Sequence, residues 1–156
     1  VIVDKAGGAV FAFSPAGDPL GFAPALLGSA IGDDAAPGIG EQDMSAIPPD
    51  LRTTPAGRFV ATYGYANGNK RVLWVDFTTA ISLHPVVPGT RREKRLERIN
   101  SPTPDDNRIT YGCINVPPEF YDDVIEPLFA DSRGVVYIIP ETRALDEVFL
   151  SFRDID

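Results

Sequence analysis

Residues 72–83 read Val-Leu-Trp-Val-Asp-Phe-Thr-Thr-Ala-Ile-Ser-Leu. Most of these residues are β-branched or aromatic, and such side chains favour extended strands. Shorter β-rich runs occupy Val1–Asp4, Ala9–Ser14 and Arg58–Tyr63, and an apolar run occupies Val135–Ile139. Turn-forming residues separate these runs, so the sequence predicts a sheet built from short strands.

Two segments have the character of helices. Arg91–Ile99 is strongly charged, whereas Pro118–Phe129 places apolar residues at helical spacing and begins with proline. Pro127 is expected to kink or end the second helix near Glu126, because its ring cannot donate a backbone hydrogen bond. The Gly- and Pro-rich stretch Pro15–Pro55 is expected to form a long surface excursion. Strands with two short helices and no βα alternation predict a mainly β or α+β fold.

Length and composition exclude several classes of function. The 156 residues suit a single domain spanning 1–156. A net charge of −8 argues against a nucleic-acid-binding surface, which would need many Lys and Arg residues. No apolar run is long enough for a transmembrane helix. The chain starts at Val1, which already belongs to a strand-like run, so we expect the numbering to begin inside a longer precursor with a removed export signal.

The chain has one cysteine, Cys113, and one histidine, His84. One cysteine cannot form an internal disulfide, and this pair alone cannot build a zinc or other transition-metal site, so no metal or cofactor is expected. A free thiol is mostly protonated at neutral pH, and a neighbouring imidazole is the usual means of activating it. The alternative is structural: a small buried thiol and a histidine bonded to backbone.

The surroundings of these two residues favour catalysis. Gly112 precedes the cysteine and permits a tight turn in which backbone N–H groups can converge on an oxyanion. His84 ends the strand-like run and would be held rigidly at a sheet edge. The two residues are 29 positions apart, a separation that costs little in loop-closure entropy.

The motifs around these residues resemble the catalytic domain of L,D-transpeptidases, the YkuD family. Thr54-Pro55-Ala56-Gly57-Arg58-Phe59 is similar to the T-P-x-G-x-F element of that family. A histidine after an apolar strand follows, and then Thr110-Tyr111-Gly112-Cys113-Ile114-Asn115 stands where the family has S/T-H-G-C, a hydrophobic residue, and Asn or Arg. The resemblance runs in order over most of the chain and implies a YkuD-like mixed β-sandwich.

The resemblance also implies a function. Cys113 would attack a peptide carbonyl of a peptidoglycan stem and form a thioester, with His84 as its base, oriented by a backbone carbonyl such as that of Pro85. The N–H groups of Tyr111, Gly112 and Cys113 would form the oxyanion hole, and an acceptor amine would complete a 3-3 or 1-3 cross-link. Carbapenem acylation, location in the periplasm or cell envelope, and a part in cell-wall biogenesis and cell shape are implied in the same way.

The motif residues Thr110 and Asn115 are candidates for substrate contact. Arg108 is another candidate, because it lies five residues before Cys113 and is expected close to the thiol. Arg108 could equally be an ion-pair partner of Asp105 or Asp106. Two alternatives to cross-linking stay open. Water could resolve the thioester, giving an L,D-carboxypeptidase or amidase, or the domain could be an inactive peptidoglycan-binding module.

The chain departs from the family pattern at two places. Tyr111 replaces the usual histidine before Gly-Cys, and the interval between His84 and Cys113 is longer than usual because it contains the basic segment 91–98. That segment is either a solvated helix face or a lid whose Arg91, Arg92 and Arg95 bind stem-peptide carboxylates.

Overall fold

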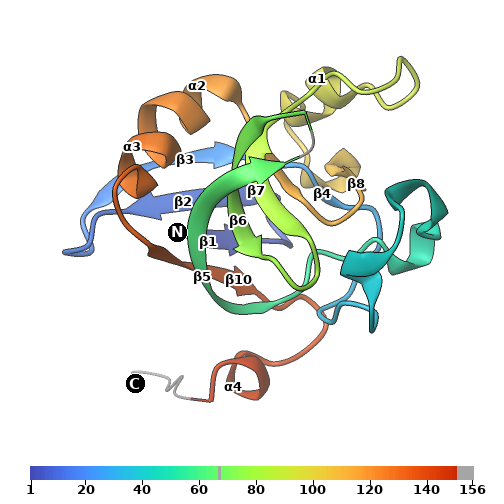
Figure 1. The fold of residues 1–156 in the computed structure, drawn as a ribbon, viewed down its shortest axis with the longest axis horizontal. Coiled ribbons are helices and arrows are strands. Elements are labelled where there is room, and N and C mark those ends of the chain that lie inside the picture. The colour runs from blue at the N-terminus through green and yellow to red at the C-terminus, as the bar shows by residue number, and fades with distance from the viewer. Residues whose placement is uncertain (67, 151–156) are drawn as a thin grey trace.

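The computed structural model describes residues 1–66 and 68–150 and contains one large mixed sheet (Figure 1). Its eight strands lie in the order β3-β2-β1-β10-β5-β6-β7-β9. A separate two-stranded parallel pair joins β4 (Leu27–Gly28) to β8 (Arg108–Thr110). The prediction of a mainly β or α+β fold is confirmed. The strands of the large sheet are β1 (Ile2–Asp4), β2 (Ala9–Phe13), β3 (Pro19–Pro24), β5 (Gly57–Ala66), β6 (Lys70–Asp76), β7 (Ile81–Pro85), β9 (Ile114–Val116) and β10 (Gly134–Ile139).

The ten-residue strand β5 joins the two halves of this sheet. One half contains β3, β2, β1 and β10, and the other contains β6, β7 and β9. Buried side chains from both halves form a single apolar cluster, which includes Val10, Ile138, Leu73 and Ile114. Neighbouring strands are antiparallel except in the pairs β1–β10 and β7–β9, which are parallel. The second exception brings the candidate site together, as described below.

Residues 118–129 form one continuous helical segment, as predicted. It consists of α2 (Pro118–Phe120), a π-helical turn η5 (Tyr121–Ile125) and α3 (Glu126–Phe129). The helix was expected to kink or end near Glu126; it does not end there but continues to Phe129. The wider π turn lies immediately before Pro127, so the helix continues past a residue that cannot donate to the preceding turn. Tyr121, Ile125 and Phe129 recur every four residues and pack into the core.

Other elements differ from the expectations. The run 72–83 is two strands joined by a turn at 77–80, and the helix expected from Arg91 begins at Arg95, as α1 (Arg95–Ile99). The Gly- and Pro-rich stretch 15–55 contains β3, β4 and three 3-10 turns as well as loops.

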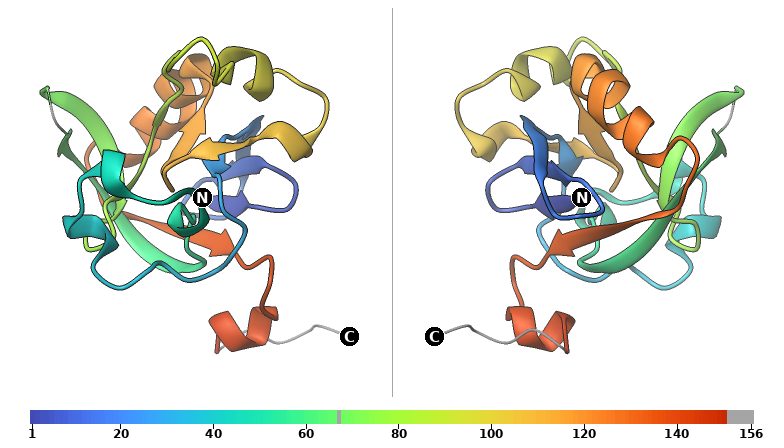
Figure 2. Two further views of the ribbon diagram at one scale, coloured as in Figure 1. Left: turned by 90° about the vertical axis from the view of Figure 1, so that its right-hand side faces the viewer. Right: turned by 90° about the vertical axis from the view of Figure 1, so that its left-hand side faces the viewer.

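A short α4 (Leu145–Val148) lies apart from the sheet, below it in Figure 2. No helix in the described ranges is long and apolar enough to cross a membrane. The 3-10 turns are η1 (Ile39–Glu41), η2 (Met44–Ala46), η3 (Pro49–Leu51) and, later in the chain, η4 (Pro104–Asp106).

A buried ion pair connects three distant parts of the chain. The Lys5 ammonium lies 2.6 Å from an Asp33 carboxylate oxygen, and both side chains are fully buried. Lys5 also donates to the carbonyls of Gly32 and Thr54, at 2.5 and 2.9 Å. Asp33 accepts hydrogen bonds from the backbone N–H groups of residues 141–143. The pair therefore connects residues 32–33 and the T-P-x-G-x-F element to the chain that follows β10.

Hydrogen bonding keeps Asp33 ionised. Burial by itself would raise the pKa of this carboxyl group, but the hydrogen bonds from Lys5, Thr142 and Glu141 outweigh burial and hold the pKa well below its ordinary value. A carboxyl group with a depressed folded-state pKa stabilises the fold above its unfolded pKa of about 3.9. That contribution is lost as the pH falls through the lower, folded-state pKa.

The substitution Asp33→Asn is expected to lower the free energy of unfolding by up to about 3–5 kcal/mol at pH 7, because the buried Lys5 would lose its nearest carboxylate and keep only Glu141, which lies 3.5 Å away and is already paired with Arg108. Urea denaturation measures the loss. The neighbouring Asp34→Asn is the matched control, since the Asp34–Arg143 pair is largely exposed and should contribute little. The difference between wild type and Asp33→Asn should shrink below about pH 4. Equal losses from both variants would contradict this role of the buried pair.

Candidate active site

Four polar side chains lie on one face of the β7–β9 pair. Residues two apart on a strand share a face, so Ser82 and His84 of β7 point the same way. The parallel register pairs His84 with Asn115, which places Cys113, just before β9, beside Ser82. Cys113 and His84 are therefore diagonal neighbours on this face, and the pKa of each is shifted by the other.

Parallel pairing also accounts for the long interval between the histidine and the cysteine. Two adjacent parallel strands need a crossover connection of a dozen or more residues. The chain leaves β7 after Pro85, passes through α1, and returns through β8 to β9. The basic segment is part of this crossover, so its length does not separate His84 from Cys113.

The thiol of Cys113 is partly exposed and has two polar neighbours. Its Sγ lies 3.5 Å from Ser82 Oγ and 3.7 Å from the carbonyl oxygen of Ala80. Burial alone would raise the pKa of the thiol. Interaction with the His84 imidazole, and then with the Ser82 hydroxyl, outweighs burial and lowers the pKa of Cys113 below that of an ordinary cysteine.

The imidazole of His84 is held at both nitrogens. Nδ1 lies 2.8 Å from the carbonyl oxygen of Pro85, the contact expected from the sequence, and Nε2 lies 3.1 Å from Nδ2 of Asn115. Burial would lower the pKa of His84, but interaction with Cys113 and with the Pro85 carbonyl raises it overall, against the opposing charge of Arg95. The pKa values of the thiol and the imidazole thus move toward each other, as in a nucleophile and its base.

The turn before the nucleophile is tightly constrained. Gly112 has φ +129°, and a Cβ atom at this position would lie 2.8 Å from the Thr53 carbonyl oxygen and 2.7 Å from Ile81 Cδ1. Only glycine fits there. The Thr110 hydroxyl closes the turn by donating to the Cys113 carbonyl at 2.6 Å and accepting from the Gly112 N–H at 3.1 Å.

The T-P-x-G-x-F element holds this turn from the other side. The Thr54 hydroxyl is fully buried, donates to the Gly112 carbonyl at 2.7 Å, and accepts from the Gly28 N–H at 2.9 Å. Thr54 therefore connects β4, the T-P-x-G-x-F element and the cysteine turn. The two motifs that carry the family resemblance are in direct contact through this hydroxyl.

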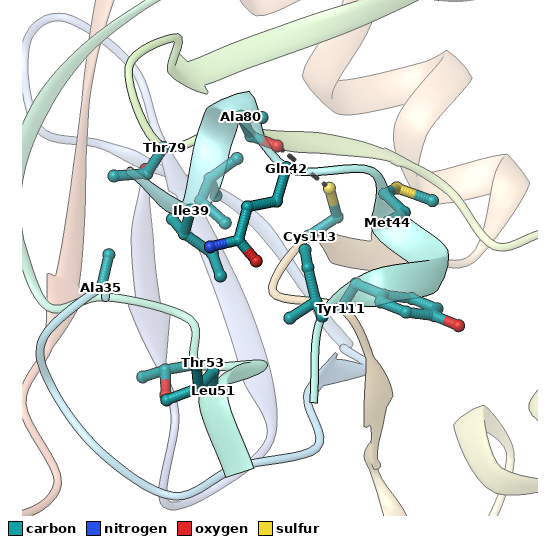
Figure 3. Close-up of a pocket in the computed structure, with 12 residues that line it drawn as sticks. Ala35, Ile39, Gln42, Met44, Leu51, Thr53, Thr79, Ala80, Tyr111 and Cys113 are labelled. Atoms are coloured by element: carbon teal, nitrogen blue, oxygen red, sulfur yellow. Dashed lines mark hydrogen bonds between the residues drawn. The ribbon is translucent and has the colours of Figure 1, made fainter. Parts of the chain in front are cut away.

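The thiol opens into a small pocket (Figure 3) with a cavity volume of about 40 Å³. The roof of this pocket is the segment 35–53, which contains η1, η2 and η3 and lies over Cys113 and Tyr111. The Arg52 guanidinium fixes the roof by donating to the Ile47 carbonyl and by stacking 4.0 Å from the centre of the Tyr111 ring. All lining side chains are uncharged: Ala35, Ile39, Gln42, Met44, Ile47, Leu51, Thr53, Thr79, Ala80, Ile81, Tyr111 and Cys113.

The structure gives the predicted site residues the following contacts. Thr110 and Asn115 are buried: Thr110 hydrogen-bonds within the cysteine turn, and Asn115 contacts the imidazole. The Gly112 N–H already donates to Thr110, which leaves the N–H groups of Tyr111 and Cys113 as the oxyanion-hole candidates. Tyr111 does line the pocket beside the thiol.

Arg108 faces away from the thiol. Its guanidinium forms an ion pair with Glu141 and donates to the Lys5 carbonyl at 2.8 Å. The partner is thus Glu141 and not Asp105 or Asp106, and the arginine belongs to the buried charge cluster around Lys5. Strand β8 extends between the two regions, so closeness to Cys113 in sequence did not mean closeness of the side chain.

The basic segment 91–98 is partly a solvated face and partly buried. Arg91 and Arg92 are exposed, as on a solvated face. Arg95 is buried and donates to Asn115 Oδ1 at 3.3 Å and to Glu93 at 2.8 Å. It therefore reaches the site from behind the imidazole and is not positioned as a lid over the thiol.

Two parts of the site were missed by the sequence reasoning. Ser82 contacts the thiol and could have been found from the alternation of Ser82 and His84 along one strand. The roof segment gave no such signal, because its 3-10 turns are too short to show a periodic pattern.

The rate of Cys113 alkylation by iodoacetamide is expected to follow a thiolate titration with a midpoint below about 8.5, the ordinary value for cysteine. Removing the imidazole in His84→Ala should raise this midpoint by about one pH unit or more, because burial then acts without compensation. Ser82→Ala is the comparison variant and should raise it less. An unchanged midpoint in His84→Ala would show that the imidazole does not activate the thiol.

The substitution Thr54→Val keeps the shape of the side chain and removes both hydrogen bonds of the hydroxyl. It is expected to lower the free energy of unfolding by about 1–3 kcal/mol and to slow alkylation of Cys113, because the Gly112 carbonyl and the Gly28 N–H lose their partner. Thr54→Ser should restore most of both properties. If the serine variant behaved like the valine variant, packing of the methyl group would be the relevant contribution.

Comparison with known proteins provides no family assignment for this chain. No model of a known protein family matches it, and no curated protein matches it. The functional conclusion therefore depends on the geometry of Cys113 and His84 and on the motifs that surround them.

Proposed function

We propose that this protein is a cysteine acyltransferase of the L,D-transpeptidase type, acting on peptidoglycan stem peptides. The observation that carries the proposal is the position of Cys113. Its thiol opens into a pocket, lies on the same sheet face as His84, and has a lowered pKa because of that imidazole. A thiol buried for packing alone would have neither a pocket nor a base.

The first half-reaction is acylation of the enzyme. Nε2 of His84 takes the thiol proton, and the thiolate attacks a carbonyl carbon in the pocket. The N–H groups of Tyr111 and Cys113 are the donors available to the resulting oxyanion. When the intermediate collapses, the C–N bond breaks, the amine leaves with the proton from the imidazolium, and a thioester to Cys113 remains.

The second half-reaction releases the acyl group. An acceptor amine attacks the thioester while neutral His84 removes its proton. The C–S bond then breaks, and the proton returns to the sulfur. No oxidant or cofactor is needed, because each step moves only an acyl group and a proton. With water as the acceptor, the same residues give a hydrolase.

The substrate class rests on the resemblance of the two motifs to the L,D-transpeptidase pattern, supported by their direct contact through Thr54. This class of substrate places the enzyme in the periplasm or cell envelope. The uncharged pocket wall favours a small apolar group next to the attacked carbonyl, such as the methyl group of an alanine. The charged ends of a stem peptide would then lie outside this pocket.

Incubation of the protein with purified muropeptide monomers is expected to give cross-linked dimers, identified with their bond type by mass spectrometry. Cys113→Ala should abolish the products, and His84→Ala should lower the rate by about 10²–10⁴-fold, the usual contribution of a general base. A carbapenem should add its mass to the wild type and not to Cys113→Ala.

The other outcomes separate the rival functions. Trimmed monomers without dimers would identify a hydrolase that uses the same thioester. An intact fold with neither products nor a carbapenem adduct, together with binding to peptidoglycan, would identify an inactive binding module and overturn the proposal.

A further inference from the structure

Behind the imidazole lies a chain of three side chains that ends in the basic segment. Arg95 Nη1 is 3.3 Å from Asn115 Oδ1, and Asn115 Nδ2 is 3.1 Å from His84 Nε2. Asn115 is fully buried, and Arg95 is 9% exposed. Both side chains that connect the basic segment to His84 are therefore largely shielded from solvent.

The groups at the two ends of this series of side chains can act only as a donor or only as an acceptor, and they determine the direction of every hydrogen bond between them. A guanidinium only donates, so the Asn115 atom that faces Arg95 must be the carbonyl oxygen, and the NH₂ group must face His84. At the other end, the Pro85 carbonyl only accepts, so Nδ1 of His84 must carry a proton. The remaining nitrogen, Nε2, is then the acceptor in a neutral ring.

Protonation of Nε2 would disrupt this arrangement. An Nε2–H would face the NH₂ group of Asn115, donor against donor. The amide could rotate to offer its oxygen to the ring, but its NH₂ would then face the guanidinium, again donor against donor. The positive charge of Arg95 opposes the imidazolium as well. Both effects favour the neutral base.

We infer that Arg95 is a positioning residue that acts through Asn115 to hold His84 in the neutral, Nδ1-protonated form between the two acyl-transfer steps. This role rests on the proposed function, because the second half-reaction needs a base without a proton. The charged or titratable groups that face His84 are Cys113, across the diagonal of the site, and Arg95 from α1, with Glu93 paired behind Arg95.

The loop around Arg95 is built to hold it. Glu93 accepts from the Thr90 N–H at 2.6 Å and pairs with Arg95 Nη2 at 2.8 Å. A side chain at Gly89, where φ is +66°, would lie 2.9 Å from Arg95 Nε. That Nε is buried without a hydrogen-bond partner among the described residues. Buried unpaired donors are rare, and here the two amino groups of the guanidinium make the contacts while Nε is left over.

The ring of His84 can be observed directly, because the chain contains one histidine. In ¹⁵N NMR of the wild type, the neutral ring is expected to carry its proton on Nδ1. The measurement is repeated in a Cys113→Ser background, which removes coupling to the thiolate. There, Arg95→Met should raise the pKa of His84 by about 0.5–1 unit, since it removes the donor and the charge but keeps much of the stem. Arg95→Lys, which also only donates, should restore a large part of the shift.

Glu93→Gln is the matched control, because it alters the loop and leaves the contact between Arg95 and Asn115. It should leave the Nδ1-protonated tautomer in place and move the pKa of His84 in the opposite direction from Arg95→Met, since it removes a negative charge. An unchanged pKa in Arg95→Met, or a rise of equal size in Glu93→Gln, would overturn the inference. A neutral wild-type ring with its proton on Nε2 would overturn it without any variant.

This experiment uses no substrate, so its result is independent of the proposed function. A protein that fails to process muropeptides but shows the expected tautomer and pKa shifts would keep the inference about Arg95 and lose the transpeptidase proposal. The converse result would keep the proposed function and remove Arg95 from it.

Discussion

Parallel pairing of β7 with β9 is the constraint on which the candidate site depends. The two strands run in the same direction with His84 opposite Asn115, so Cys113, just before β9, lies beside Ser82 and diagonally from His84 although many residues separate them in sequence. An antiparallel pair can be joined by a short hairpin loop. The parallel pair instead requires a long crossover, and that crossover supplies Arg95 to the back of the site.

The rest of the fold keeps the turn before Cys113 rigid. The Thr54 hydroxyl holds the Gly112 carbonyl, and the ion pair of Lys5 with Asp33 holds the Thr54 carbonyl and the start of the roof. Burying two charges is costly unless their hydrogen bonds are well satisfied, and here several carbonyl and N–H groups satisfy them. A nucleophile on a turn is positioned only as well as the contacts behind it. The buried charges are therefore best understood as support for the site.

The sequence was sufficient to predict β1, β2, β5 and β10, the run that contains β6 and β7, the helix at 118–129 and the two residues most suited to chemistry, because each has a local signal. The short strands β3, β4, β8 and β9 were not predicted. The turn that divides 72–83 had no such signal. Ala80 adopts φ +58° there without being glycine, and Asp76 closes the turn through its carboxylate, hydrogen-bonding the Thr78 N–H and the Thr79 hydroxyl. Arg108 shows a second limit. Its long side chain reaches Glu141, 33 positions away, and the direction in which it points depends on the packing of the whole fold.

A cysteine–histidine pair that carries out two successive acyl transfers has conflicting requirements. The first transfer is favoured by a basic imidazole that takes the thiol proton readily, whereas the second needs an imidazole that has lost that proton. Contact with Cys113 raises the pKa of His84, and Arg95 with Asn115 works in the opposite direction. The ordinary base of such a pair needs only a carbonyl at Nδ1 to fix its tautomer, which Pro85 already supplies. The additional contact at Nε2 supports the same tautomer and adds a second effect: it weakens the binding of a second proton at Nε2.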